Sequence, residues 1–436
     1  MKHHHFPLRV FLVAYSVLWA GVLPLVLVYF FLRGRKDALY RRHLSERFGM
    51  VLQPIPGAIW VHTVSLGEFR SALPLIRALL DRGDNVHVTC VTPTGRREAE
   101  AHLMGDIRAG RARVTWLPLD MAWTCRRFLR LARPKAGLLM EMEFWPRLLT
   151  SADRIGLPVY FCNAQYPEKT FHRDQTLTRP LGWAMALAAG AMVKSNLHKG
   201  RFAARGVAPI YVTGELRFDQ RVPAQLVAAG QALRRSFHAE ERSVITIASA
   251  IQGEDELLAD AIVQIFQRQP ETLVVYIPRA PERFDDVART IERTGLRLVR
   301  RSQVLGEDLA PSGPLPEDIQ VLLGDSLGEM YAYLSMADRV VVGGGFVHKG
   351  AHNISEAFAL LKPVWVGQNI WTIEFPAKEA LAAGVLRIVP SDPAVIAREM
   401  CAGVCSAPED VAEFFSVHSG ALERTLAALD AELGRN

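Results

Sequence analysis

Cysteine is scarce in this chain, and its spacing fits neither a metal site nor a disulfide framework. The 436 residues contain five cysteines, with no Cys-x-x-Cys pair and no zinc-finger spacing to a histidine. The five are Cys90, Cys125, Cys162, Cys401 and Cys405. We expect reduced core thiols in a protein that faces the cytosol. No metal is assigned to them, nor to the run His3-His4-His5, which is either natural or left over from a purification tag.

Basic charge is not spread over the chain as nucleic-acid binding would require. The formal net charge is +6, but residues 33–48 alone hold six Lys or Arg against two acidic residues. We therefore expect no nucleic-acid partner, because a local basic segment attracts anionic lipid headgroups or an acidic lipid substrate instead. Long disordered segments are not expected either. Half of the residues are hydrophobic, and the length suffices for two domains.

Charge is absent from the 23 residues between and including Val10 and Leu32. As a helix this run spans about 35 Å, against about 30 Å for the hydrocarbon core of a bilayer. A signal peptide is the alternative, but its apolar region would be shorter and would end in small residues rather than in Tyr29-Phe30-Phe31-Leu32. The basic residues follow the run, so the positive-inside rule places the rest of the chain in the cytoplasm. We predict one membrane anchor over residues 1–33.

Beyond residue 57, short apolar strands alternate with helices in two series. The first series runs from the strand Ala58–Val64 to Tyr211–Gly214, and the second runs from Val244–Ala248 to Pro363–Val366. This alternation predicts two α/β, Rossmann-like domains with parallel sheets, which form a cleft at the carboxyl ends of their strands. The predicted boundaries are 34–220 and 244–405 for the domains, 221–243 for a helical linker, and 406–436 for one final helix, Pro408 to Leu433, packing back across the domains.

Three glycines, Gly343-Gly344-Gly345, end one of these strands ahead of a helical pattern. Glycine permits positive φ and brings backbone N–H groups close to a ligand, and the start of a helix adds more N–H groups, so an anion fits here. Asn353 or Ser355 can cap the helix, and Glu356 can accept hydrogen bonds from vicinal hydroxyls such as those of a ribose. The alternative is that the glycines only turn the chain and that Glu356 only complements the helix dipole.

Carboxylates follow strands of the first domain. Glu68 comes after a strand at a Ser-Leu-Gly turn, where it can act as a general base toward a hydroxyl or as a helix cap. Glu141 and Glu143 would share one face of another strand, pointing into the cleft or forming only a polar strand end. In the second domain Arg279 follows a strand and can fork onto a phosphate. Together these features describe a nucleotide donor facing an acceptor hydroxyl, as in a sugar transferase.

The ordered motifs resemble the membrane-anchored Kdo transferases of Gram-negative lipopolysaccharide synthesis, which move the acidic sugar Kdo from CMP-Kdo to the lipid A precursor. Nearly the whole chain takes part. The matching segments are Tyr40-Arg41-Arg42, Glu46-Arg47-Phe48-Gly49, residues 62–68, Thr92-Pro93-Thr94-Gly95, residues 141–146 and 214–219, Pro278-Arg279, residues 281–284 and 324–329, and His352-Asn353 with Glu356.

The resemblance implies a GT-B fold at the cytoplasmic face of the inner membrane, and inversion at the anomeric carbon without a metal or other cofactor. It implies Glu68 as the base, with Glu141 and Arg217, a lysine in many relatives, supporting the transition state. The first domain would receive the acceptor, a lipid A precursor or related lipid. The CMP donor would be held by Pro278, Arg279, Leu327, Gly328, Glu329, Asn353, Ile354, Ser355 and Glu356.

The sequence also departs from the family pattern where sugar and acceptor are expected to bind. Ala250-Ile251 replaces a Thr-His pair, Ala280 replaces a histidine, and residues 165–170 lack the usual arginines and serines. A divergent paralogue is one consequence. Two alternatives to transfer therefore stay open: a homologue that binds nucleotide or lipid without transfer, and a sugar-nucleotide epimerase of similar architecture.

Overall fold

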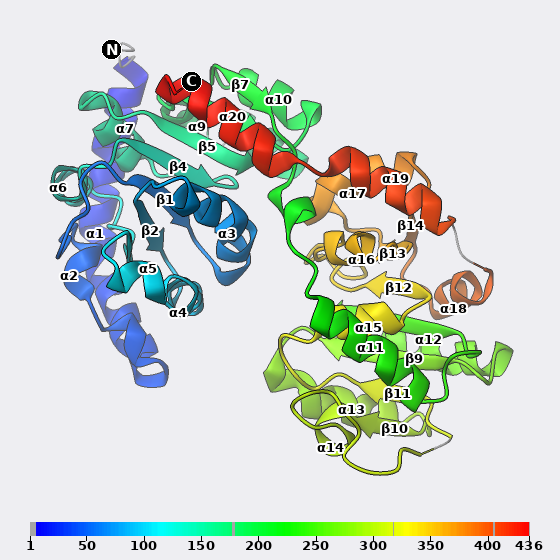
Figure 1. Ribbon diagram of the computed structural model, residues 1–436. Helices are drawn as coiled ribbons and strands as arrows, with labels where there is room; N and C mark the ends of the chain where they lie inside the picture. Colours follow the sequence, from blue (N-terminus) through cyan, green and yellow to red (C-terminus); the bar gives the residue numbers. More distant parts are fainter. Residues whose placement is uncertain (1–5, 177–178, 317, 404–405, 436) are drawn as a thin grey trace. The chain divides into compact units, whose positions relative to one another are not determined.

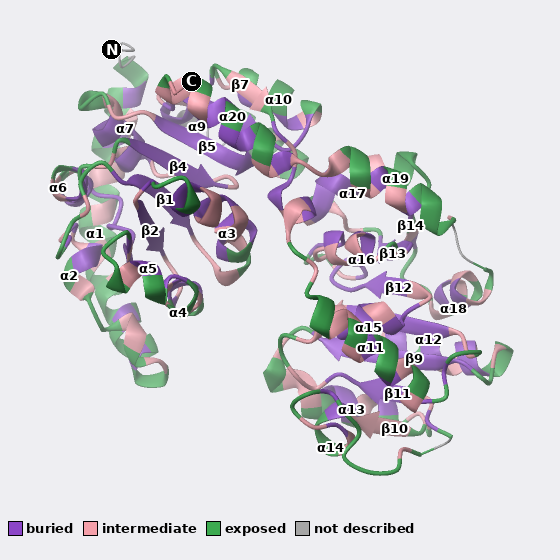
Figure 2. Ribbon diagram, in the orientation of Figure 1, coloured by how far each residue is buried: buried purple, intermediate pink, exposed green. Residues whose placement is uncertain are grey.

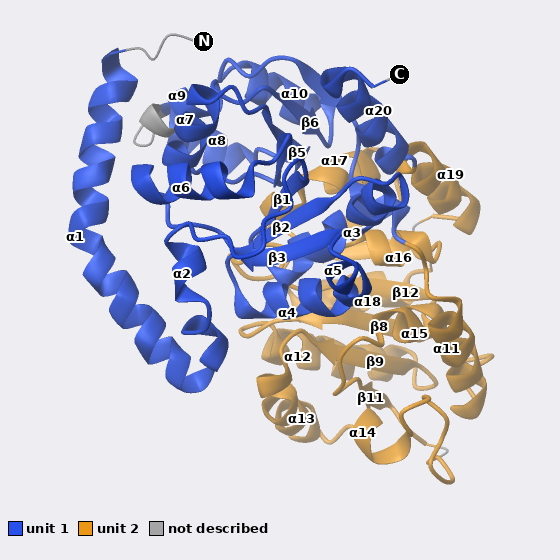
Figure 3. Ribbon diagram, turned by 60° about the vertical axis from the view of Figure 1, so that its left-hand side comes forward, with its two compact units in different colours: residues 1–220, 420–436 blue, residues 221–419 orange. Residues whose placement is uncertain are grey.

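The computed structural model describes residues 6–176, 179–316, 318–403 and 406–435 (Figure 1). The run His3-His4-His5 and Cys405 lie outside these residues. The chain divides into two compact units. Unit 1 consists of residues 1–220 and 420–436, and unit 2 of residues 221–419 (Figure 3). The last segment of the chain therefore belongs to the same unit as the first.

Unit 1 is built on a seven-stranded parallel sheet in the order β3-β2-β1-β4-β5-β6-β7. Its strands are β1 (Ile59–Thr63), β2 (Val86–Cys90), β3 (Ala112–Trp116), β4 (Ala136–Met140), β5 (Val159–Ala164), β6 (Gly190–Val193) and β7 (Ile210–Val212). In β1, Val61 lies opposite Val88 of β2 and Leu138 of β4. All five residues of β1 are buried, as expected for a parallel sheet covered on both faces (Figure 2).

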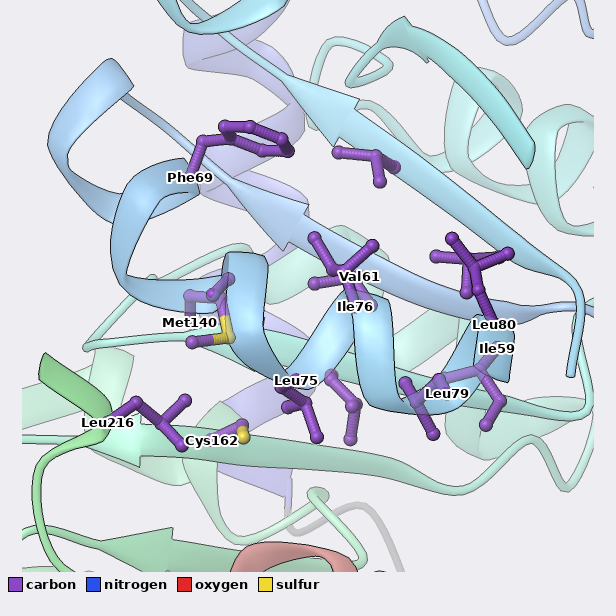
Figure 4. Close-up of a cluster of buried hydrophobic side chains, with 14 of the residues drawn as sticks. Ile59, Val61, Phe69, Leu75, Ile76, Leu79, Leu80, Met140, Cys162 and Leu216 are labelled. Atoms are coloured by element: carbon purple, nitrogen blue, oxygen red, sulfur yellow. The ribbon is translucent and has the colours of Figure 1, made fainter. Parts of the chain in front are cut away.

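Successive residues of each strand point to opposite faces of this sheet. Ile59 and Val61 pack with α3 and α20, whereas Trp60 packs with α6 and α7. Figure 4 shows Leu75, Ile76 and Leu79 of α3 within the first of these cores. The helices of unit 1 are α1 (Phe6–Lys36), η1 (Ala38–Tyr40), α2 (Leu44–Arg47), α3 (Leu66–Asp81), α4 (Pro93–His102), α5 (Met104–Arg108), α6 (Ala122–Ala132), α7 (Pro146–Arg154), α8 (Glu168–Thr176), α9 (Arg179–Met185), α10 (Asn196–Ala203), η2 (Leu216–Asp219) and α20 (Ala421–Leu433).

Unit 2 repeats the plan with a second parallel sheet, in the order β10-β11-β9-β8-β12-β13-β14. Its strands are β8 (Val244–Ala250), β9 (Leu273–Pro278), β10 (Leu298–Arg300), β11 (Val321–Leu323), β12 (Arg339–Val342), β13 (Val364–Gly367) and β14 (Leu386–Val389). One face packs on α12, α13 and α18, and the other on α11 and α15. Both sheets are thus sandwiched between helices.

The helices of unit 2 include one that the sequence predicts as a linker. They are α11 (Ala224–Ser236), α12 (Asp255–Arg268), η3 (Pro281–Arg283), α13 (Phe284–Glu292), α14 (Arg301–Val304), α15 (Met330–Met336), α16 (Ser355–Ala359), η4 (Trp371–Ile373), α17 (Glu374–Ala382), α18 (Pro393–Cys401) and α19 (Pro408–His418). The predicted linker over 221–243 contains α11. This helix packs against α15 inside unit 2, because Leu233 is buried with Met336.

Helix α1 is long and apolar enough to cross a membrane by its length and composition. It also packs against the rest of unit 1 near both of its ends. Leu8 and Leu12 are buried against Ala184 of α9, and Phe30 is buried against Leu119 and Met121. In addition, the guanidinium of Arg147 on α7 donates hydrogen bonds to the carbonyl of Leu12 and to the hydroxyl of Ser16. Most of the remaining surface of the helix is exposed.

Two local predictions are wrong. The final helix is not continuous from Pro408 to Leu433, because Ser419 and Gly420 separate α19 from α20, and Gly420 has a φ of +80° that ends regular helix. Glu141 and Glu143 do not share a strand face, because β4 ends at Met140 and Glu141 has a left-handed φ of +59°. Both differences arise from backbone angles that the apolar pattern does not encode.

Candidate active site

Glu68 lies in the first turn of α3, just beyond the carboxyl end of β1. Its carboxylate accepts a hydrogen bond from the backbone N–H of Val64 at 2.7 Å and one from the Ser65 hydroxyl at 3.4 Å. Ser65 in turn accepts from the N–H of Glu68, so the two residues cap the helix reciprocally. The capping interpretation of Glu68 is therefore correct, and it leaves the general-base role open.

Burial raises the pKa of Glu68 to about 7, and the negative charge of Glu141 adds to this rise. The hydrogen bond from Val64 and the charge of Arg217 act in the opposite direction. A carboxyl group with a pKa near 7 exists in both protonation states at neutral pH, which is what proton transfer requires. Arg217 is thus near enough to Glu68 for its charge to act on that carboxyl group. The catalytic roles of Glu68, Glu141 and Arg217 stay a prediction.

Glu141 forms an ion pair with Lys194, which the sequence did not indicate as a site residue. The ammonium of Lys194 lies 2.7 Å from the Glu141 carboxylate and 2.6 Å from that of Glu215. The Lys194 side chain is only 1% exposed. A buried cation of this kind requires compensating charge, and here it has two carboxylates.

Asn163 completes the network at the end of β5. Its amide donates to Glu141 at 3.2 Å, to Glu215 at 3.0 Å and to the Ser71 hydroxyl at 3.0 Å, and its carbonyl accepts from the N–H of Leu216 at 3.0 Å. Burial alone would raise the pKa of Glu215, but the charges of Lys194 and Arg217 lower it. The ends of β4, β5, β6 and β7 are thus joined by one polar network.

Glu143 is the second carboxyl group of this region with a raised pKa. Burial raises it to about 8, and the charges of Glu68 and Glu141 contribute to the rise. The predicted pairing of Glu141 and Glu143 therefore resolves into two different environments. The carboxylate of Glu141 is paired with Lys194, whereas the carboxyl group of Glu143 is subject to the negative charges of Glu68 and Glu141.

The sequence holds a weak signal for the residues that were missed. Lys194 and Asn163 stand at the carboxyl ends of aliphatic strands, where ligands of parallel sheets collect. Glu215 lies within residues 214–219, one of the segments that match the family motifs. A charged or amide side chain at the carboxyl end of any strand of the sheet is therefore a candidate site residue.

In unit 2 the glycine loop binds an anion that belongs to the protein itself, and Gly344 is the glycine whose N–H takes part. The carboxylate of Glu254 accepts hydrogen bonds from the N–H groups of Gly344 at 2.7 and 2.8 Å, of Phe346 at 3.0 Å and of Ile251 at 3.0 Å. Glu254 is fully buried. The prediction that this loop attracts negative charge fits, but the charge is Glu254 and not an open position for a ligand.

These glycines are also required by space. A Cβ on Gly343 would lie 2.7 Å from the backbone of Ala250 and Ser249, and a Cβ on Gly344 would lie 2.4 Å from the carbonyl of Gly350. Gly344 has a φ of +91° as well. The loop therefore reaches its shape only with glycine, and it carries the chain from β12 to the segment that opens α16.

The predicted donor residues Asn353 to Glu356 open α16. The Asn353 side chain accepts from the N–H of Ser355 at 3.1 Å and from its hydroxyl at 2.7 Å. Ile354 and Ser355 are buried. Glu356 occupies the first helical turn, and after burial its charge is the next cause of the raised pKa of Tyr331.

Arg279 directly follows Pro278, the last residue of β9, and its backbone N–H donates to the carbonyl of Ala250 at 2.9 Å. Burial, followed by the positive charge of Arg279, lowers the pKa of His352 to about 4. His352 is thus neutral at physiological pH. The structure brings Arg279 together with the segment that ends the glycine loop.

The third donor segment, Leu327 to Glu329, stands at the start of α15. Leu327 is exposed and Gly328 has a φ of +87°. The carboxylate of Glu329 is already used, because it forms an ion pair with Arg301 at 2.6 Å and accepts from the Tyr333 hydroxyl at 2.8 Å. Its side chain therefore fixes this turn rather than projecting from it. Among the residues that the structure describes, no group of three or more His, Cys, Asp or Glu is arranged to hold a metal ion.

Comparison with known proteins identifies a consistent set of relatives. Residues 42–220 match the family described as 3-Deoxy-D-manno-octulosonic-acid transferase (kdotransferase). A 3-deoxy-D-manno-octulosonic acid transferase of Bordetella pertussis is 35% identical over 435 residues, which cover 96% of this chain and 99% of the relative.

Two solved structures share the fold over 87% of this chain. A glycosyltransferase from Rickettsia africae is 11% identical with a TM-score of 0.57, and a UDP-GlcNAc 2-epimerase from Neisseria meningitidis is 13% identical with a TM-score of 0.53. Each alignment covers 100% of the other chain. At these identities the likeness concerns the fold alone. It extends over both parallel-sheet units, in agreement with the predicted GT-B-type α/β architecture.

Proposed function

Because this chain belongs to the family of Kdo transferases, the glycosyltransferases that add Kdo in lipopolysaccharide synthesis, we propose how it performs the transfer. The donor is CMP-Kdo and the acceptor is a hydroxyl of a lipid A precursor or a related lipid. The reaction inverts the anomeric carbon and needs no metal. Glu68 is the general base.

The observation that carries this proposal is the position and pKa of Glu68. Its carboxylate stands at the carboxyl end of β1, where ligands of parallel sheets bind, with a pKa raised to about 7. In the proposed step the ionised Glu68 accepts the proton of the acceptor hydroxyl. The hydroxyl oxygen then forms a bond to the anomeric carbon of Kdo, while the bond from that carbon to the phosphate oxygen breaks and its electron pair leaves with CMP.

Glu141 and Arg217 act beside Glu68 on the charges of the transition state. Lys194 and Asn163 hold the Glu141 carboxylate in one position, which is the kind of support that a preorganised site needs. Arg217 supplies positive charge near Glu68, as its effect on the Glu68 pKa indicates. This charge favours the ionised base and can face the anionic sugar.

The donor nucleotide is assigned to unit 2. Arg279 is suited to the CMP phosphate because a guanidinium can donate two parallel hydrogen bonds to it. Asn353 to Glu356 and the Leu327-Gly328-Glu329 turn surround the rest of the nucleotide, and Glu356 accepts from the ribose hydroxyls. Because Glu254 already occupies the glycine loop, the phosphate binds outside that loop.

We also place the enzyme at the cytoplasmic face of the inner membrane, with α1 as its anchor. The uncharged run and the basic residues that follow it support this location. A lipid acceptor is consistent with it, since a soluble acceptor would not require an anchor.

One assay tests the donor, the acceptor, the inversion and the independence of metal. The full chain in detergent or lipid is incubated with radiolabelled CMP-Kdo and lipid A precursor, with and without a chelator, and the anomeric configuration of the product is read by NMR. Labelled lipid with the inverted configuration, formed equally with the chelator, is expected. Retention of configuration, or loss of transfer in chelator that is restored by a divalent metal, would contradict the mechanism.

A homologue that binds CMP without transferring Kdo is the second candidate. The observation in its favour is the set of departures at Ala250-Ile251, Ala280 and residues 165–170, where polar groups of the family are replaced. The same assay separates the two, because a pure binder would retain CMP and form no labelled lipid with any acceptor.

A further inference from the structure

A second basic surface of unit 1 lies away from the candidate active site. A groove of about 1040 Å³ runs along α6 and the end of α7, and its lining includes Trp123, Arg126, Arg127, Arg130, Arg133 and Ile155. Residues 122–135 contain four arginines and one lysine and no acidic residue. This concentration of one sign of charge is independent of the basic segment at residues 33–48.

The arginines of the groove are not neutralised by the protein. Within the residues that the structure describes, none of Arg126, Arg127, Arg130 and Arg133 forms an ion pair, and Arg126, Arg130 and Arg133 are exposed. Lys135, by contrast, forms an ion pair with Asp84 at 2.6 Å. Exposed apolar side chains accompany the charges, because Trp123 is 48% and Ile155 is 60% exposed. The surface is therefore both cationic and apolar, and it suits an anionic amphiphile.

The groove cannot serve the reaction directly. Lys135 precedes β4 and Pro158 precedes β5, whereas Glu141 and Asn163 stand at the opposite ends of those strands. A strand of this length separates its two ends by roughly 16 Å. The end of the groove that Lys135 and Pro158 line is consequently at the amino-terminal edge of the sheet, and the carboxylates are at the carboxyl edge.

Both elements that line the groove touch the anchor helix. The start of α6 is buried against α1, since Met121 packs with Phe30. Trp123 stacks on Phe48 with ring centroids 5.8 Å apart, and Phe48 packs in the same cluster as Phe30. On the other side, Arg147 of α7 donates to α1 at Leu12 and Ser16. A membrane in contact with the exposed face of α1 is thereby brought next to the groove.

We propose that the α6 groove is a second membrane contact of unit 1, which binds the anionic headgroups of the bilayer that holds α1. The proposal rests on the proposed membrane location of α1. The arginines supply the charge complement of phospholipid phosphates, and Trp123 and Ile155 sit at the level of the headgroups as amphipathic and apolar contacts. Through this contact the bilayer orients unit 1 as well as retaining it.

The test measures the reactivity of individual arginines in the full chain. The protein is placed in nanodiscs of phosphatidylcholine alone, or of phosphatidylcholine with phosphatidylglycerol, and is treated with phenylglyoxal, which modifies free guanidinium groups. Mass spectrometry gives the rate at each arginine. We expect Arg126, Arg130 and Arg133 to react about fivefold or more slowly in the anionic discs, as headgroup binding occupies them. Arg235, Arg268 and Arg293, which are exposed in unit 2, are the internal controls and keep one rate.

A variant pair provides a second readout. Deuterium exchange at residues 151–158, the other wall of the groove, should slow in anionic discs for the wild type. That slowing should disappear in Arg126→Gln/Arg130→Gln/Arg133→Gln and persist in Arg235→Gln/Arg268→Gln/Arg293→Gln, which removes the same charge from unit 2. Persistence in both triple variants would overturn the proposal.

Other outcomes are equally decisive. Equal phenylglyoxal rates in both kinds of disc, with the protein retained by both, would overturn the groove contact and leave the anchor intact. Protection by glycerol phosphate added to phosphatidylcholine discs, to the same extent as by anionic lipid, would show a small-anion site and not a bilayer contact. A chain that stays with neither disc would contradict the anchor and the groove together.

Discussion

At the level of single residues, the carboxylate of Glu68 has a structural and a chemical task that can be separated. Capping needs only a hydrogen-bond acceptor near Val64 and Ser65, and a glutamine side chain supplies one. Proton transfer needs an ionisable group. The two tasks therefore respond differently to the same substitution.

We expect Glu68→Gln to keep the fold and CMP binding and to lower turnover by about 100-fold or more, the order expected for a positioned base. The measurement is the initial rate of Kdo transfer, with CMP affinity determined by calorimetry. As a control, Ser65→Ala should lose about 1 kcal/mol of stability from the cap and retain most of the turnover. Turnover within threefold of wild type in Glu68→Gln would eliminate Glu68 as the base.

The raised pKa of Glu68 makes a pH profile informative. Only the ionised carboxylate can accept a proton, so kcat/KM should rise with pH through about 7 and level off above it. The sign for stability is opposite. The folded-state pKa lies above the ordinary value of 4.5, so the stability associated with the protonated group is lost as pH rises through about 7. A flat activity profile between pH 6 and pH 8 would contradict this assignment.

Lys194 offers the clearest stability prediction. Lys194→Met should destabilise unit 1 by about 3–5 kcal/mol, because it leaves the carboxylates of Glu141 and Glu215 without their shared cation in a buried site. Chemical denaturation measures the loss. Lys199→Met, on the exposed side of α10, is the matched control and should change little. Adding Glu141→Gln to Lys194→Met should recover part of the loss, and a double variant as unstable as the sum of both changes would argue against the network.

These residues also mark how far a sequence leads toward a site. Glu68 and Arg279 were found because each follows an aliphatic run, and the end of such a run is visible in the sequence. The ion pair between Lys194 and Glu141 could not be found in this way. The two residues follow different strands and meet only through the left-handed turn at Glu141. The sequence places polar residues at strand ends, but it does not say which of them turn toward one another.

At the level of elements, the glycine loop after β12 shows how one segment shapes another. Glu254 at the start of α12 and the N–H groups of Gly344 and Phe346 are about 90 positions apart in sequence, and they form one buried contact. The pattern of three glycines predicted a loop that binds a ligand anion, and it could not indicate that a distant carboxylate of the protein binds there instead. The break between α19 and α20 is comparable, since helical periodicity continues through Ser419 and Gly420.

We expect Glu254→Gln to destabilise unit 2 by about 1–3 kcal/mol, because the amide group presents donors to a loop that already consists of donors. CMP affinity should fall as well, since the loop leads into Asn353. Denaturation and calorimetry measure the two effects. Glu256→Gln, exposed on the same helix, should alter neither. An unchanged stability of Glu254→Gln would mean that the loop holds its shape by glycine alone.

At the level of the whole molecule, donor and acceptor recognition should have diverged to different extents. The residues assigned to CMP match the motifs on which the resemblance to Kdo transferases rests, whereas by the same resemblance Ala250-Ile251, Ala280 and residues 165–170 depart from them. In the structure Tyr166 of this last segment is fully buried, with its hydroxyl donating to Asp174 at 2.9 Å. Tyr166 is therefore part of the core of unit 1.

Calorimetry with CMP, UDP and GDP tests the donor side, and CMP should bind most tightly. Transfer of Kdo to the standard lipid A precursor should be weak, since losing a charge-assisted hydrogen bond costs about 1.5–3 kcal/mol, a tenfold to hundredfold change in affinity. A modified acceptor should restore it. Tighter binding of UDP than of CMP would contradict the assignment of a CMP site. Efficient transfer to the unmodified precursor would show that the substitutions at Ala250-Ile251, Ala280 and residues 165–170 do not affect acceptor use.

The division of unit 1 between the two ends of the chain has a consequence for its synthesis. The core of this unit contains Leu426 and Leu429 of α20, and Asp219 accepts hydrogen bonds from the N–H groups of Gly420 and Leu422. During translation these residues leave the ribosome after all of unit 2. The first half of the newly made chain must therefore wait, with part of its core uncovered, until residues 420–433 have left the ribosome. Unit 2 carries no such requirement, because all of its residues lie within one continuous stretch.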